Sequence, residues 1–414
     1  MNLGNLVFIV LGGIVPLAYI AYIIASRKAS VWENQNISLH SRPYMYGWFV
    51  VVIMGIPSMV VSLIAGLLHV TGIYSVSPFI VIVACIVLVA SGFTFGLKKI
   101  SPDFRARNKV ENVIKWFLIA ASLVSIMTTV GIVLSILFEA LRFFDAVGFW
   151  NFITGTSWNP DTAFLSGAGR GGEDAANAEF GAVPIFAGTF MITFIAMCVA
   201  VPVGLFSAVF LAEYASPKFR KIMKPLLEVL AGIPTVVYGF FAAITVSPLV
   251  VKLAALLGLK AAYTNALSPG IVMGIMIIPL MSSLSDDVIN AVPQSLREGS
   301  LALGTTVSET TKKVVLPAAL PGIVSAFLLS VSRAIGETMI VVMAAGLRPN
   351  LTANPLEGMT TVTVRIVDSL TGDQSFDSLE TLSAFGLGFV LLILTLILNI
   401  ISTIIVRKFR EKYE

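Results

Sequence analysis

The chain has 414 residues, of which 57% are hydrophobic and 12% are charged. Soluble domains are typically about 45–50% apolar and about 25% charged, so this composition excludes an ordinary globular protein and indicates one that crosses a membrane repeatedly. The net charge of +4 would suit a nucleic-acid partner. However, the basic residues gather at the ends of apolar runs, where membrane orientation explains them better, and we expect no nucleic-acid partner.

The sequence lacks the usual motifs for catalysis and for metal or nucleotide binding. Its two histidines, His40 and His69, have no HExxH spacing, and no GxxxxGK[ST] phosphate loop occurs. Its two cysteines, Cys85 and Cys198, lie in separate apolar runs, which predicts neither a disulfide framework nor a metal site. We therefore expect a chain that needs no cofactor or metal and is not itself an enzyme.

Nine apolar runs reach the length of about 20 residues that a membrane helix needs. One of them, 226–257, is unusually long and contains Gly232, Pro234 and Pro248. This pattern predicts a kink or break, and we expect Gly232 and Pro234 to bend a gating helix rather than bind a ligand. The predicted spans are residues 3–25, 47–68, 73–97, 114–141, 183–211, 226–257, 269–289, 318–345 and 382–406.

The lysines and arginines predict the orientation of these spans. Arg27 and Lys28 follow the first apolar run instead of preceding it, which predicts a true span and not a signal peptide. When alternate loops are assigned to the cytoplasm, most basic residues fall on that side. The positive-inside rule then places the N-terminus outside and the C-terminus in the cytoplasm.

We predict an all-α, polytopic membrane protein in three parts. Residues 1–100 hold three spans without internal polar chemistry, and residues 101–112 form a short charged cytoplasmic linker. Residues 113–414 form a six-span unit with two acidic outer loops, 143–182 and 347–381.

The cytoplasmic loop 290–317 is too long for a simple connector and begins with helix signals. Pro293 and the pattern Ser295-x-x-Glu298 predict the start of a short helix. Gly304 should end this helix, because a left-handed C-terminal residue costs glycine little.

The second half of the same loop predicts another short helix. It should begin at the pattern Thr306-x-x-Glu309 and end before Leu316-Pro317. The whole would be a helix–Gly–helix hairpin on the cytoplasmic surface. Such a hairpin is either a loop lying on the surface or a knob that docks a soluble partner.

Arg333 and Glu337 fall near the middle of the predicted span 318–345, one helical turn apart. Ionisable groups inside a membrane cost about 2.5–3.5 kcal/mol on insertion scales and usually face a water-filled path or a partner charge. The two side chains either neutralise each other or form an anion path, in which the arginine fork meets the anion and the glutamate moderates the attraction. Three hydroxyl residues that flank them would line this path or serve helix packing: Ser330, Ser332 and Thr338.

The hairpin resembles the cytoplasmic "EAA" loop of ABC importer permeases, which has the form E-A-A-x3-G-x9-I-x-L-P. The matching positions, at unchanged offsets, are Glu298, Gly299, Ser300, Gly304, Val314, Leu316 and Pro317. In that family the loop sits in a cleft of the ATPase subunit. The resemblance therefore implies that residues 298–316 are the coupling helix pair.

Three narrower phrases resemble the PstC-type permeases of phosphate importers. These phrases are residues 211–215, 224–239 and 333–339. The likeness covers about residues 113–414, and the three leading spans depart from the common six-span form. The resemblance implies a type I importer permease in the bacterial inner membrane that passes inorganic phosphate, and it points to Arg333 and Glu337 as functionally sensitive.

The resemblance also implies partners: a second, PstA-type permease, a PstB-type ATPase dimer, a periplasmic PstS-type phosphate-binding protein and the membrane lipid. Alternatives remain open at this point. One alternative is a permease for another oxyanion, such as sulfate or molybdate. Another is a stand-alone anion transporter or channel, which would need no docking hairpin. A role as scaffold or sensor would give the three leading spans a purpose.

Overall fold

The computed structural model describes residues 3–35, 37–70, 77–160, 179–371 and 377–410. The chain divides into two compact units, Met1–Gly131 and Ile132–Glu414, and each is described here by itself. The helix α4 (Ala106–Val147) contributes residues to both units. The predicted linker 101–112 is already helical from Ala106 onward, and the predicted division of the chain at that linker stays a prediction.

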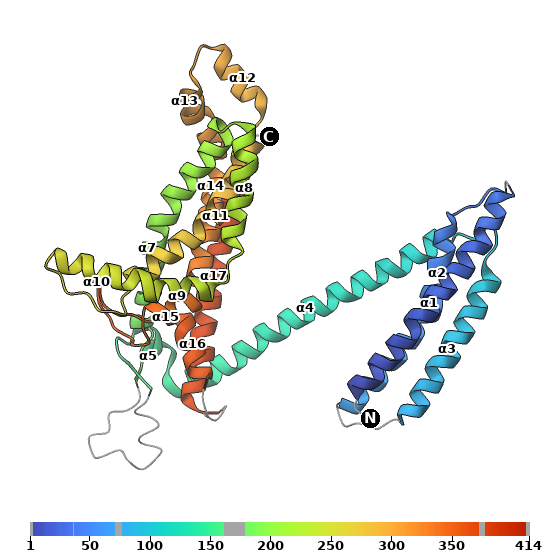
Figure 1. Ribbon diagram of the computed structural model, residues 1–414. Coiled ribbons are helices and arrows are strands. Elements are labelled where there is room, and N and C mark those ends of the chain that lie inside the picture. Colours follow the sequence, from blue (N-terminus) through green and yellow to red (C-terminus); the bar gives the residue numbers. More distant parts are fainter. Residues whose placement is uncertain (1–2, 36, 71–76, 161–178, 372–376, 411–414) are drawn as a thin grey trace. The chain divides into compact units, whose positions relative to one another are not determined.

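In the first unit, three long helices precede α4 (Figure 1): α1 (Leu3–Asn34), α2 (Pro43–Val70) and α3 (Pro78–Lys99). Helix α2 packs against both α1 and α3, and its Tyr46, Val50 and Met54 are buried in the shared core. The close approach of α3 depends on Gly92, where a Cβ atom would lie 2.7 Å from the Cα of Met54.

The second unit is a helical bundle with a small two-stranded antiparallel β-sheet in which Trp158 pairs with Phe180. The predicted outer loop 143–182 contains both strands, and residues 161–178 of that loop lie outside the described part. The elements after α4 are α5 (Phe149–Thr154), β1 (Trp158–Asn159), β2 (Glu179–Phe180), α7 (Val183–Val209), the π-helical η1 (Phe210–Tyr214), α8 (Pro217–Ala231), α9 (Thr235–Phe241), the π-helical η2 (Ala242–Val246), α10 (Ser247–Leu256), α11 (Leu267–Ala291), α12 (Gln294–Ala302), α13 (Val307–Thr310), the π-helical η3 (Thr311–Val315), α14 (Leu316–Ile335), α15 (Met339–Ala344), α16 (Val362–Leu370) and α17 (Leu379–Arg410).

The core of the second unit forms where α11 packs against both α7 and α14. Lipid is as apolar as the helices, so close approach of small residues is an important source of helix association in membranes. A Cβ on Gly274 would lie 2.7 Å from the Cβ of Val199, and one on Gly322 would lie 2.3 Å from Cγ1 of Val288. These glycines let α7 and α14 close on α11, most of whose membrane-spanning stretch is buried.

Within the described residues, nine helical stretches are long and apolar enough to cross a membrane, which confirms the number of predicted spans. They are Gly12–Asn34, Pro43–Gly66, Pro78–Lys99, Ala106–Val147, Val183–Tyr214, Thr235–Leu256, Leu267–Ala291, Val307–Ile335 and Leu379–Lys408.

Two of the predicted spans are interrupted in the structure. The predicted run 226–257 begins in the amphipathic α8, breaks at residues 232–234, and continues as α9, η2 and α10, which run across the bundle (Figure 1). Pro248 causes no break, because it directly follows the π-helical η2, whose wider turn accommodates a residue that lacks an N–H. In the predicted run 318–345 the helix α14 ends at Ile335, and helical structure resumes only at Met339 with α15.

Candidate functional site

The first half of the predicted hairpin is the helix α12. It ends as expected, because Gly304 follows it with a φ of +85°, a conformation that favours glycine. The predicted Ser295–Glu298 capping box is wrong. Pro293 has the extended backbone of the residue before a helix (φ −55°, ψ 136°), so Ser295 already lies inside α12 and cannot cap it.

The second half of the hairpin begins with the capping box that the sequence predicts. Thr306 Oγ1 accepts a hydrogen bond from the N–H of Glu309 (3.3 Å), and the carboxylate of Glu309 accepts one from the N–H of Thr306 (3.0 Å). The predicted end before Leu316-Pro317 is wrong, since α13 continues through η3 into α14. The wider π-helical turn accommodates Pro317, which lacks an N–H and would clash with a regular preceding turn.

Three hydroxyl groups hold the two halves of the hairpin together. Ser300 Oγ lies 2.8 Å from Thr305 Oγ1 and 3.0 Å from Thr310 Oγ1, and these two threonine oxygens lie 2.9 Å apart. Ser300 and Thr310 are buried. Ser300 occupies the second alanine position of the family motif, and in this chain it belongs to a polar cluster. Glu298 and Gly299 remain exposed on the outside of α12.

Arg297 anchors the hairpin to the bundle, and sequence reasoning missed it. Its guanidinium group donates to Glu213 Oε1 in η1 (3.0 Å) and to the carbonyl oxygens of Ile289 (2.6 Å) and Val292 (2.5 Å) at the end of α11. The side chains of Arg297 and Glu213 are only 13% and 10% exposed. One side chain thus joins α12 to two membrane-spanning segments.

We expect Arg297→Met to lower transport sharply while the protein still reaches the membrane. The variant leaves Glu213 buried without its partner, which typically costs about 3–5 kcal/mol, and frees the end of α11 from α12. Transport and membrane level would be measured side by side. The matched control is Arg107→Met, which breaks an exposed pair with Glu111 of the kind worth less than about 1 kcal/mol. Equal transport by both variants would contradict the anchoring role.

A cavity of about 330 Å³ opens between α8, α11 and α14. Its wall carries charged groups and hydroxyls as well as apolar side chains. The residues that line it are Leu211, Lys224, Leu227, Glu228, Ala231, Met276, Pro279, Leu280, Ser282, Ser283, Asp286 and Arg333. The cavity therefore brings together two basic side chains from different helices, Lys224 of α8 and Arg333 of α14.

The first cation, Lys224, is held by acids of α11. Its Nζ lies 3.1 Å from Asp286 Oδ2 and 3.1 Å from Asp287 Oδ1, and these hydrogen bonds raise the pKa of Lys224. Arg220 also binds the buried Asp286, at 2.9 Å. Basic neighbours thus compensate the acids Asp286, Asp287 and Glu213 at this end of the bundle.

The second cation, Arg333, has no ion-pair or hydrogen-bonding partner among the residues that the structure describes. The predicted geometry, with Arg333 and Glu337 one turn apart in a single helix, is wrong. Helix α14 ends at Ile335, and Glu337 lies in the break, where its Oε1 accepts the N–H of Met339 at the start of α15. Arg333 thus reaches the cavity without a direct ion pair among the described residues, although the carboxylate of Glu228 lines the same cavity.

The other predicted path residues, Ser330, Ser332 and Thr338, are not among those that line this cavity. Ser332 lies in α14, next to Arg333. Ser330 is fully buried with its Oγ 3.8 Å from the sulfur of Met281, so it packs α14 on α11. Thr338 precedes α15. The cavity hydroxyls are instead Ser282 and Ser283 of α11, and Ser282 Oγ is buried with no hydrogen-bonding partner among the described residues. The sequence signal that could have identified Ser282 and Ser283 is their place near Asp286 in an otherwise apolar span, because polar groups in a span often mark a functional site.

The two helix breaks lie against each other. After Gly232 and Pro234, Tyr238 of α9 donates a hydrogen bond back to the carbonyl oxygen of Leu230 (2.9 Å), which also accepts the N–H of Ile233 (3.3 Å). Helix α9 packs on α15, where a Cβ on Gly239 would lie 2.9 Å from the carbonyl oxygen of Met339. Both interruptions are therefore part of one packed core rather than separate kinks.

The family of binding-protein-dependent transport system inner membrane components matches residues 200–411, a stretch that contains the cavity and the hairpin. The chain belongs to this family. A second match, to a family described as phosphate ATP-binding cassette transporter, covers residues 11–76 of this permease, within its first unit.

Curated relatives extend the likeness over most of their own lengths. The permease is 31% identical over 280 residues to the probable ABC transporter permease protein YqgH of Bacillus subtilis, a match covering 67% of this chain and 84% of the relative. It is 32% identical over 278 residues to the phosphate transport system permease protein PstC 1 of Mycobacterium bovis, covering 62% and 82%. It is 30% identical over 298 residues to the PstC protein of Mesorhizobium japonicum, covering 68% and 86%.

Proposed function

We propose that this chain is the PstC-type permease subunit of an ATP-driven importer of inorganic phosphate. The observation that carries the proposal is the anchored hairpin 294–315, which keeps the spacing of the ATPase-coupling loop in a chain of the importer permease family. The cargo follows from the relatives that are named as phosphate permeases. A free arginine at a cavity suits an oxyanion, because its fork can bind two oxygens at once.

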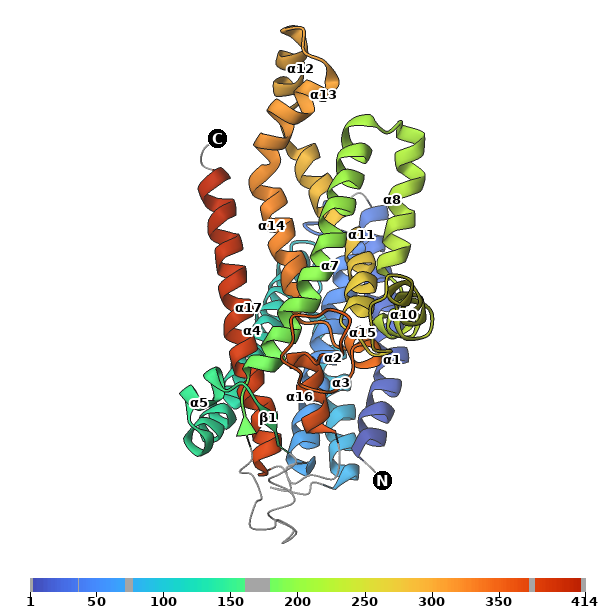
Figure 2. The same cartoon turned by 90° about the vertical axis from the view of Figure 1, so that its left-hand side faces the viewer.

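The hairpin is the surface on which a PstB-type ATPase dimer would dock. Its exposed side chains include Glu298 and the apolar Leu296 and Leu303, which are 41% and 87% exposed. Figures 1 and 2 show the hairpin beyond one end of the second unit, near the end of α17. ATP hydrolysis belongs to the partner, and this chain is a transport subunit. We assign that end of the bundle, and the C-terminus with it, to the cytoplasm, and the N-terminus to the periplasm.

The phosphate path would form between this subunit and a PstA-type permease in the inner membrane. A periplasmic PstS-type protein would deliver phosphate to it. Within this chain we assign the path to Arg333 of α14, with Ser282 and Ser283 of α11 as further donors in the cavity wall. The helix breaks at Gly232–Pro234 and beside Glu337 are the points where a gate could bend without breaking further backbone hydrogen bonds.

Uptake of radiolabelled phosphate in cells without their own phosphate importer tests this function. The chain would be expressed with the ATPase, second permease and binding protein encoded beside it. We expect ATP-dependent uptake that unlabelled phosphate suppresses and that sulfate or molybdate leaves unchanged. Suppression by sulfate or molybdate alone would make another oxyanion the cargo, and uptake without the ATPase would favour a stand-alone transporter.

Deletion of residues 1–100 should leave the remaining spans correctly oriented and still able to transport some phosphate. The deletion leaves α4 whole, since it begins at Ala106, and keeps the basic residues 105–115 that hold its start in the cytoplasm. Orientation would be measured by labelling engineered cysteines from each side of the membrane. A truncated chain that inserts correctly but no longer co-purifies with its partners would make residues 1–100 part of the assembly surface.

A further inference from the structure

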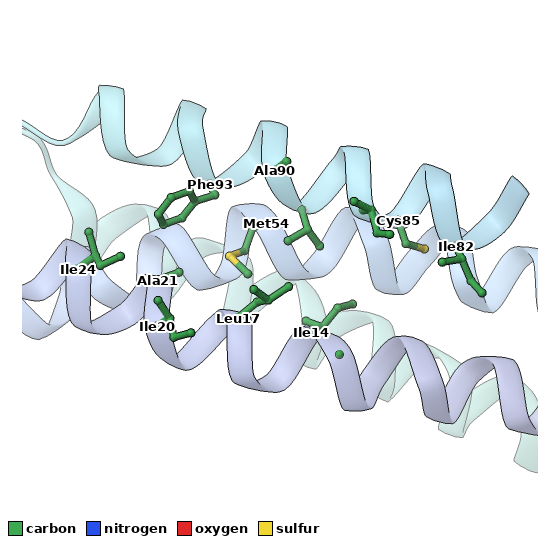
Figure 3. A pocket seen from close by; sticks show the side chains of 13 residues that line it. Ile14, Leu17, Ile20, Ala21, Ile24, Met54, Ile82, Cys85, Ala90 and Phe93 are labelled. Atoms are coloured by element: carbon green, nitrogen blue, oxygen red, sulfur yellow. The ribbon is translucent and has the colours of Figure 1, made fainter. Parts of the chain in front are cut away.

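An apolar groove of about 600 Å³ runs along the first unit between α1 and α3 (Figure 3). Met54 of α2 lies at its floor, with Leu17 and Ala21 of α1 on one side and Phe93 of α3 on the other. All of its lining side chains are apolar, Cys85 included. Within a membrane such a groove must be filled by another apolar body.

The length of the groove favours a lipid chain over a protein helix. Its wall on α1 extends from Gly13 to Ile24, which is about 16 Å at 1.5 Å per residue. This is about half of the ~30 Å hydrocarbon core, the depth of one leaflet. A partner helix that crosses the membrane would need a groove through its whole thickness.

One end of the groove is closed and basic. The lining positions of α1 recur every three or four residues, up to Ile24, and the same helical face continues with Arg27 and Lys28. Lys28 Nζ bridges to α3 by donating to the carbonyl oxygen of Leu97 (2.9 Å) and lies 5.8 Å from the ring of Trp32. Arg27 is exposed and has no partner among the residues that the structure describes.

We propose that this groove binds one anionic phospholipid of the leaflet on its basic side. An acyl chain fills the groove from Ile24 toward Gly13, and the phosphate meets Arg27 and Lys28. The free charge of Arg27 gives the site its preference for an anionic over a zwitterionic headgroup, since basic residues at a membrane surface attract anionic lipid. This lipid site depends neither on the hairpin nor on the phosphate path.

Native mass spectrometry of the purified full chain would test the lipid site. Dipalmitoyl phosphatidylglycerol would be titrated against the matched phosphatidylcholine. We expect one phosphatidylglycerol bound in preference to phosphatidylcholine. Gly13→Phe should abolish this binding, and Gly12→Phe should leave it unchanged. A Cβ on either glycine meets nothing within 4 Å in the part of the chain that the structure describes, and Gly13 lines the groove whereas Gly12 does not.

A second pair of variants tests the headgroup. Arg27→Gln should weaken phosphatidylglycerol binding by about fivefold, the effect of one basic side chain near a membrane surface, without changing phosphatidylcholine binding. Arg105→Gln removes an exposed charge outside the groove face and should have no effect. Equal behaviour within either pair would overturn the proposal. So would a Gly13→Phe chain that keeps its lipid but loses a partner subunit, because a protein helix would then occupy the groove.

Discussion

Phosphate uptake should fall by about thirtyfold or more when Arg333 is replaced by glutamine, while the protein reaches the membrane and retains its ATPase. The variant removes the charge and the planar fork from the cavity wall. A hydrogen-bonded charge lost from a desolvated contact costs about 2 kcal/mol or more. Initial uptake rates, membrane levels and co-purified ATPase would be measured on the same preparations.

Two further variants identify what Arg333 does. Arg333→Lys keeps the charge but not the fork and should restore only part of the uptake. The double variant Arg333→Gln with Glu337→Gln should be as inactive as Arg333→Gln alone, because the structure shows no ion pair between these residues. Normal uptake by the double variant would mean that the two charges only neutralise each other, and the path assignment would fail.

Glu337→Gln alone should act differently from the loss of Arg333. In the structure Glu337 lies at the start of α15, and its side chain accepts the N–H of Met339, which an amide oxygen can also do. The fold should therefore persist. Without the negative charge near the path, we expect phosphate to be held longer and the transport cycle to slow, visible as a lower maximal uptake rate.

The second large effect is expected at the turn of the hairpin. Gly304→Val should abolish uptake. A side chain at a φ of +85° costs about 1–3 kcal/mol. The turn would relieve this strain by changing its backbone conformation, which would redirect α13. No atom lies within 4 Å of the added Cβ, so the effect comes from the backbone alone. Gly304→Asn should restore some uptake, since asparagine tolerates this conformation.

Gly258→Val is the matched control for this variant. Gly258 also has a positive φ, +72°, and open space around its Cβ, but it lies between α10 and α11 and away from the hairpin. It should suffer the same backbone strain and still transport. If Gly304→Val binds the ATPase and transports like Gly258→Val, the hairpin is not the coupling element.

The number of spans and the turn chemistry were predictable from the sequence because both depend on local signals. Apolar runs of sufficient length identify membrane helices, and Gly304 and the Thr306–Glu309 pair act within a few residues of themselves. The break after Ile335 was not predictable in this way. The segment stays apolar on both sides of it, and the interruption belongs to the packing of α15 on α9, about a hundred residues away in the chain.

The anchor and the cavity were missed for a similar reason. Arg297 is one basic residue in a basic loop, and its partner Glu213 is 84 residues away. Ser282 and Ser283 are small residues in an apolar helix, where helix packing is the usual explanation. Arg333 was identified because its charge is costly in any membrane setting, although the sequence assigned it a partner that the structure does not provide.

The hydrogen bonds of Arg297 to the end of α11 couple the position of the hairpin to that of the helix. The carbonyl of Ile289, which Arg297 holds, and the hydroxyl of Ser282 in the cavity wall belong to the same unbroken helix, about 10 Å apart at 1.5 Å per residue. A displacement of the hairpin would therefore be transmitted to the cavity through a single helix. In the proposed path, rotation of α11 about its axis would change how Ser282 faces the cavity that Arg333 also lines, and docking of the ATPase on the hairpin would thereby alter the binding of the anion.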